Sequence, residues 1–131
     1  MTIKELSQLY YLNREIQQEQ QKLAELRAAA TNTTARISGL PGVVSISDKT
    51  AIAATIADTE AVIRAKTELA VVEYNRLNRY IASIPDSFMR QIISLRFVDG
   101  LTWYQVSRKV GGNNTEDGVK KACYRFLSRE N

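Results

Sequence analysis

The sequence contains no histidine, one cysteine, two prolines and six glycines in 131 residues. Without histidine it lacks the side chain that most often acts as a general acid or base, which is also the commonest metal ligand. A single cysteine, Cys123, excludes an internal disulfide and a cysteine-rich zinc site, and it favours a reducing compartment. We therefore expect a protein that is not an enzyme, with no catalytic residues, no metal ion and no cofactor.

Three other kinds of motif are missing. The pair Gly111-Gly112 is followed by two asparagines and not by the lysine and hydroxyl residue of a phosphate-binding loop. The longest apolar stretch, Ala51 to Ala57, is interrupted by Thr55 and is far too short to span a bilayer. The first residues, MTIKELSQLYYLNRE, lack the apolar core of a signal peptide. We expect no membrane partner and a cytoplasmic location.

The positive charge is unevenly distributed along the chain. The net charge is +4, from 18 basic and 14 acidic residues. Residues 1–80 carry ten Lys/Arg and nine Asp/Glu, whereas residues 81–131 carry eight and five. The shorter segment therefore holds most of the excess, which is a weak indication of a nucleic-acid partner at that end.

An apolar fraction of 44% and few helix breakers predict a packed, all-α protein. Residues 3–30 show heptad-like spacing and predict one helix about 40 Å long. Its apolar stripe consists of Leu9, Leu12, Ile16, Leu23, Leu26 and Ala30. Breakers between Thr31 and Asp48 predict a loop, with Ser47 or Asp48 as the next cap. A second helix, about 50 Å long, is predicted over residues 49–84.

Two long amphipathic helices joined by a loop predict a coiled-coil-like antiparallel hairpin, here residues 1–84. Such a hairpin could be a stalk, an oligomerisation surface or a docking surface for another protein. We favour oligomerisation into a homodimer or higher homo-oligomer, because two helices alone bury little apolar area. The candidate oligomerisation residues lie on the predicted stripes: Leu9, Ile16, Leu23, Ile56, Ile63, Ala70 and Leu77.

Pro85 marks a junction, and residues 85–131 predict a domain of three shorter helices. The first is predicted over residues 86–98 and ends at Gly100, which suits a left-handed C-cap. The second follows a Thr102 cap over residues 103–110, with Trp103 in the core. The third follows a Thr115 cap after the turn 111–114. This spacing is typical of a helix-turn-helix.

The third of these helices has two different faces. Val119, Ala122, Cys123 and Phe126 are predicted to pack inward. The opposite face is polar and basic, as a recognition helix in the major groove of double-stranded DNA requires. A charged face on a surface helix is more often merely solvated, and the three-helix context is what favours DNA. The candidate DNA-binding residues are Arg108, Lys109, Thr115, Asp117, Lys120, Lys121, Tyr124 and Arg125.

The stretch Leu95–Trp103, LRFVDGLTW, resembles the LRYxxGLT segment of region four of bacterial sigma factors. Thr115 to Val119 is similar to the start of that family's recognition helix. The intervening turn is about two residues longer than in the family, so helix three is expected to enter the groove at a different angle. The resemblance implies a sigma region four-like helix-turn-helix that binds double-stranded DNA.

The whole chain also resembles a group of phage and prophage proteins from Gram-positive bacteria related to late-gene regulators of the ArpU and RinA type. The matching segments are ISGLP at 37–41, SDKT at 47–50, YIASIPDS at 80–87 and GNNTEDGVKKACYR at 112–125. Val43 and Val44 stand where relatives have a glycine-rich loop. The resemblance implies a sequence-specific transcriptional regulator in the cytoplasm of a bacterial host cell.

We do not expect a complete sigma factor, since no segment remains for promoter melting. The protein would act beside host RNA polymerase or occupy an operator, and the sequence leaves open whether polymerase is a partner. Two alternatives remain: a DNA-packaging component similar to a terminase small subunit, and a protein-interaction module.

Overall fold

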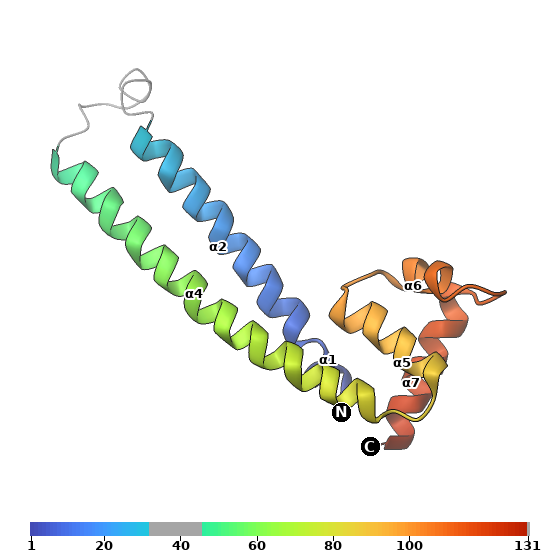
Figure 1. The fold of residues 1–131 in the computed structure, drawn as a ribbon. Helices are drawn as coiled ribbons and strands as arrows, with labels where there is room; N and C mark the ends of the chain where they lie inside the picture. The colour runs from blue at the N-terminus through green and yellow to red at the C-terminus, as the bar shows by residue number, and fades with distance from the viewer. Residues whose placement is uncertain (32–45, 131) are drawn as a thin grey trace. The chain divides into compact units, whose positions relative to one another are not determined.

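The computed structural model describes residues 1–31 and 46–130, and every element within these ranges is helical (Figure 1). This confirms the predicted all-helical class. The predicted loop from Thr31 to Asp48 lies mostly outside the described residues. In chain order the elements are α1 (Ile3–Leu6), α2 (Gln8–Thr31), α4 (Ile46–Ser83), α5 (Ser87–Ile93), the π-helical η1 (Ser94–Val98), α6 (Trp103–Val110) and α7 (Glu116–Glu130).

The first two predicted helices differ in detail from those found. The single helix predicted over residues 3–30 is wrong at Ser7, where α1 ends and α2 begins. The Ser7 hydroxyl donates a hydrogen bond to the Ile3 carbonyl oxygen at 2.7 Å, which competes with regular helix geometry. α4 begins at Ile46, so Ser47 and Asp48 lie inside it and the cap predicted at either residue is wrong.

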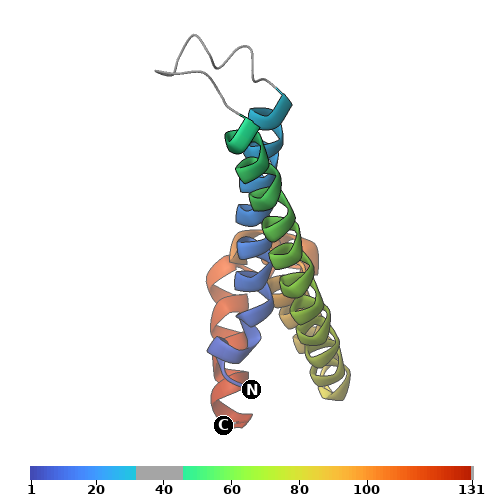
Figure 2. The same ribbon diagram turned by 90° about the vertical axis from the view of Figure 1, so that its left-hand side faces the viewer.

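The chain divides into two compact units. One comprises residues 13–68, in which parts of α2 and α4 run side by side in opposite directions (Figures 1 and 2). Ion pairs join them: Lys66 Nζ lies 3.1 Å from Glu15 Oε2, and Arg27 Nη2 lies 3.8 Å from Glu60 Oε2. Leu23 and Thr59 are buried, and Thr59 satisfies its hydroxyl by donating to the Thr55 carbonyl at 2.8 Å.

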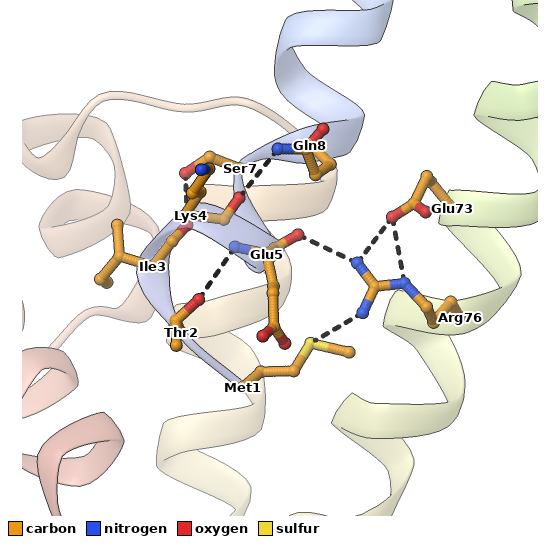
Figure 3. A network of polar contacts seen from close by, with 9 residues as sticks. All are labelled: Met1, Thr2, Ile3, Lys4, Glu5, Ser7, Gln8, Glu73 and Arg76. Atoms are coloured by element: carbon orange, nitrogen blue, oxygen red, sulfur yellow. Dashed lines mark hydrogen bonds and ion pairs between the residues drawn. The ribbon is translucent and has the colours of Figure 1, made fainter. Parts of the chain in front are cut away.

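The other unit comprises residues 1–12 and 69–131. Arg76 of α4 ties the N-terminal segment to this unit, as Figure 3 shows. Its Nη2 atom donates to the Glu5 carbonyl at 3.0 Å and lies 2.7 Å from Glu73 Oε2. One turn further along α4, the Tyr80 hydroxyl donates to Glu130 Oε2 at 2.6 Å and links α4 to α7. Residues with less than 2% exposure form the core: Leu6, Leu77, Ile84, Ile92, Ile93, Val106, Val119 and Cys123.

The helix predicted over residues 86–98 is present, with a change of winding. Asp86 caps it by accepting the Phe88 N–H at 3.0 Å. From Ser94 the winding is π-helical, and the Asp99 N–H donates to the Ser94 carbonyl at 3.0 Å. Gly100, which is predicted to cap the end of this helix, has φ +71°, in the left-handed region. The Leu101 N–H then donates a hydrogen bond to the Leu95 carbonyl at 3.1 Å.

Candidate nucleic-acid interface

α6 is fixed at its start by local hydrogen bonds that the sequence predicted in part. Thr102 accepts the Gln105 N–H at 3.2 Å, and the Gln105 side chain accepts the Thr102 N–H at 2.9 Å. This reciprocal capping box satisfies two N–H groups that the first turn leaves without helical partners. The predicted Thr102 cap is confirmed, and so is the predicted burial of Trp103; Val106 and Ser107 are buried beside it on the same helix.

A turn leads from α6 into α7. Gly111 and Gly112 have φ of +81° and +66°, values that favour glycine. The Asn114 side-chain amide donates to the Gly111 carbonyl at 2.8 Å and closes the turn. Thr115 then accepts the Gly118 N–H at 3.0 Å, which confirms the predicted cap of α7. A Cβ atom on Gly118 would stand 2.9 Å from the Thr115 hydroxyl oxygen, so this cap also requires the glycine.

The inward face of α7 is formed by Val119, Cys123 and Leu127, which are at most 3% exposed. The predicted core positions Ala122 and Phe126 are only partly buried, and Leu127 was not predicted. Burial raises the pKa of the Cys123 thiol to about 12, as expected for a neutral packing residue.

The outward face of α7 presents most of the predicted DNA-binding side chains to solvent. Asp117, Lys121, Tyr124 and Arg125 are exposed, whereas Lys120 is half-buried. Arg108 and Lys109 are exposed at the end of α6, and Thr115, the cap residue of α7, is exposed as well. The candidate residues therefore belong to α6, the turn and α7, three consecutive segments of one unit.

Asp117 and Lys121 form an ion pair on this face, with Nζ 2.9 Å from Oδ2. The hydrogen bond from Lys121, together with its charge, holds the pKa of Asp117 below its usual range. Both side chains are highly exposed, so the pair is screened by water and adds little to stability. Its consequence is local: the carboxylate offsets one of the basic charges nearest the start of α7.

Tyr124 is held from two sides. Its ring lies edge-on to the Trp103 ring, with centroids 6.1 Å apart, and the Lys120 ammonium lies 5.9 Å from its centroid. The Arg96 guanidinium lies 4.8 Å from the centroid of the Trp103 ring, and Arg96 also donates to the Leu101 carbonyl at 2.8 Å. These contacts orient a 42% exposed tyrosine beside two basic side chains.

Tyr104 is a surface residue that the sequence analysis missed. It is 58% exposed on α6, and the Arg108 guanidinium lies 6.0 Å from its ring centroid. Spacing of four residues on one helix could have revealed this pair. It adds an aromatic side chain next to Arg108, one of the candidate DNA-binding residues.

The predicted oligomerisation residues are largely covered within one chain. Leu9, Leu23, Ala70 and Leu77 are at most 8% exposed, and the remaining three are half-buried: Ile16, Ile56 and Ile63. Their predicted role in oligomerisation remains a prediction. An oligomer that preserves this burial has to use other side chains.

Within residues 1–31 and 46–130 no three acidic or cysteine side chains group as metal ligands would. None of the helices described there combines the length and apolar character needed to cross a membrane.

No protein-family model, curated protein or solved structure matches this chain.

Proposed function

We propose that the chain binds double-stranded DNA sequence-specifically and acts as a transcriptional regulator of a phage or prophage. In this proposal α6, the turn and α7 form a helix-turn-helix with α7 in the major groove. The observation that carries it is the division of α7 into a buried apolar face and an exposed basic one. Val119, Cys123 and Leu127 anchor the helix, and Lys121, Tyr124 and Arg125 remain available.

Each exposed side chain has a defined chemical capacity at a DNA surface. Lys121 and Arg125 can pair with phosphates or donate to guanine O6 and N7. Asp117 can accept from cytosine N4 or hold Lys121 in place, as its 2.9 Å contact does in the free protein. Arg108 and Lys109 at the end of α6 can contact the DNA backbone and fix the register.

The resemblance of residues 95–103 to sigma factor region four supports the same assignment. The capping box of α6 and the cap of α7 support it too, because they fix the residue at which each of the two helices begins. The paired parts of α2 and α4 correspond in this proposal to the hairpin that accompanies the DNA-binding helices. The protein acts as a homo-oligomer and, as a regulator, either beside host RNA polymerase or at an operator.

The proposal is tested by selecting bound fragments from a pool of random duplexes and of genomic DNA. We expect the full chain to enrich a common sequence and the double variant Lys121→Ala, Arg125→Ala to lose that enrichment. The double variant Lys22→Ala, Arg64→Ala removes equal charge from exposed positions of α2 and α4 and serves as the control. The absence of any enriched sequence with the unaltered chain would contradict sequence-specific binding.

A further inference from the structure

A cavity of about 310 Å³ lies within the unit of residues 1–12 and 69–131, and every residue that lines it belongs to that unit. One wall comes from α1 and the start of α2 and includes Tyr10 and Tyr11. The other comes from η1, α6 and α7 and includes Arg96, Trp103 and Tyr124. The volume is at the lower end of the range of small-molecule sites, about 300–1,000 Å³. It suits a ligand of one or two rings.

Aromatic rings line both walls of this cavity. The Tyr10 and Tyr11 rings lie edge-on to each other, with centroids 5.4 Å apart. Tyr10 also brings its wall against the opposite one, since a Cβ atom on Gly100 would stand 3.7 Å from the Tyr10 ring. In that opposite wall Trp103 lies edge-on to Phe97, with centroids 6.5 Å apart. Tyr10 and Tyr11 are 39% and 60% exposed, so a planar ligand between the walls would bury aromatic surface that now faces water.

The wall from the N-terminal segment is attached firmly to the rest of the unit. Arg76 of α4 donates to the Glu5 carbonyl at 3.0 Å and contacts the Met1 sulfur at 3.6 Å (Figure 3). Leu6 and Leu9, which alternate with the lining positions, are buried. These contacts hold the two tyrosines of this wall beside the cavity.

The charge of the cavity comes from Arg96, the one charged residue among those that line it. The side chain is half-buried, and within residues 1–31 and 46–130 no carboxylate forms an ion pair with it. Its Nη1 atom donates to the Leu101 carbonyl at 2.8 Å. A guanidinium has five N–H groups, so others remain for a ligand. A half-buried positive charge without a counter-ion favours an anion, and its planar fork matches a carboxylate.

We propose that this cavity binds a small planar aromatic carboxylate. The ring of the ligand lies between the tyrosines of the N-terminal wall and Trp103, and its carboxylate accepts hydrogen bonds from Arg96. Aromatic rings alone would also accept a cation, but Arg96 repels one. A neutral ligand forgoes the charge-assisted hydrogen bonds. The site goes beyond the proposed function and involves no DNA, so the two proposals can fail independently.

The first test uses three probes of one shape and different charge: cinnamate, cinnamyl alcohol and cinnamyl trimethylammonium. Trp103 is the only tryptophan of the chain, so its indole N–H gives a single resonance in proton–nitrogen NMR spectra of the full chain. Cinnamate is expected to shift this resonance and to saturate the shift. The alcohol is expected to bind at least about tenfold more weakly, and the cation not at all. No saturable shift with cinnamate, or equal affinity for all three probes, would overturn the proposal.

The second test removes the charge that selects the ligand. Arg96→Gln is expected to abolish the preference for cinnamate over cinnamyl alcohol. Arg79→Gln is the matched control, because Arg79 is exposed on α4 of the same unit and does not line the cavity. It should leave the preference unchanged, which separates a local contact from general attraction of anions. A folded Arg96→Gln chain that keeps the preference would contradict the site.

The third test leaves Arg96 and its contact with the Leu101 carbonyl intact, in case their loss disturbs folding. Tyr11→Ala removes a largely exposed ring from the cavity and is expected to weaken cinnamate binding about two- to tenfold. Tyr74→Ala is the control, since Tyr74 is 48% exposed in the same unit but lies outside the cavity. Equal affinity of the two variants for cinnamate would overturn the proposal.

Discussion

The Lys121 ammonium lies 2.9 Å from the Asp117 carboxylate, one turn earlier on the exposed face of α7. The pair occupies the part of α7 that would meet a base edge first. In the proposed complex a DNA phosphate would compete with Asp117 for Lys121. Arg125, which is also exposed, is not part of this ion pair. The carboxylate is expected to restrain non-specific binding and to orient Lys121.

This ion pair predicts a change in titration. In Lys121→Ala the pKa of Asp117 should rise toward its ordinary value, because the hydrogen bond and charge that lower it are gone. Since folding lowers this pKa, the pair stabilises the folded chain at pH values above the ordinary range of aspartate. That contribution is lost as the pH falls through the lowered pKa. Carboxyl-carbon NMR measures the shift directly.

Lys22→Ala, on the exposed surface of α2, is the control for this titration and should leave Asp117 unchanged. An Asp117 pKa that is the same with and without Lys121 would show that the contact is absent in solution.

Leu127 provides a prediction about the packing of α7. Leu127→Ala should lower the free energy of unfolding by about 2–5 kcal/mol, because the side chain is 3% exposed and its removal leaves a cavity. Ser128→Ala, the exposed next residue, should change it by less than about 0.5 kcal/mol. Urea denaturation measures both. Equal effects would mean that α7 packs through a different face.

The Cys123 thiol should be unreactive in the folded protein. Its complete burial and a pKa raised to about 12 leave almost no accessible thiolate at neutral pH. A colorimetric disulfide reagent should modify it only slowly in buffer and fully in concentrated urea. Rapid stoichiometric labelling under native conditions would contradict the position assigned to the inward face of α7.

Features that depend on neighbouring residues could be predicted from the sequence. The caps at Thr102 and Thr115 and the left-handed Gly100 follow from local hydrogen bonding and from backbone sterics. The inward face of α7 was predicted correctly at Val119 and Cys123. The choice between Phe126 and Leu127 was not, because adjacent residues on a helix differ by only about 100° and tertiary packing decides between them.

Other features depend on tertiary contacts, which the spacing of apolar and polar residues along the sequence does not specify. The π-helical η1 and the interruption at Ser7 replace helix that the periodicity predicted as regular. Lys66 occupies a half-buried position on α4 because Glu15 and Glu19 of α2 neutralise its charge. Spacing alone did not show that Val62, Leu69 and Val72 of α4 are exposed, since α4 carries apolar residues at many positions.

Binding of duplex DNA by the exposed face of α7 is tested by measuring how the affinity for a labelled duplex depends on salt and on the basic side chains of this face. Fluorescence anisotropy should show duplex binding by the full chain that weakens steeply with salt, as phosphate contacts require. Lys121→Ala or Arg125→Ala should each weaken binding to a selected duplex by about 1–3 kcal/mol. Lys22→Ala should have no effect. Unchanged affinity in both α7 variants would show that this face does not bind the duplex.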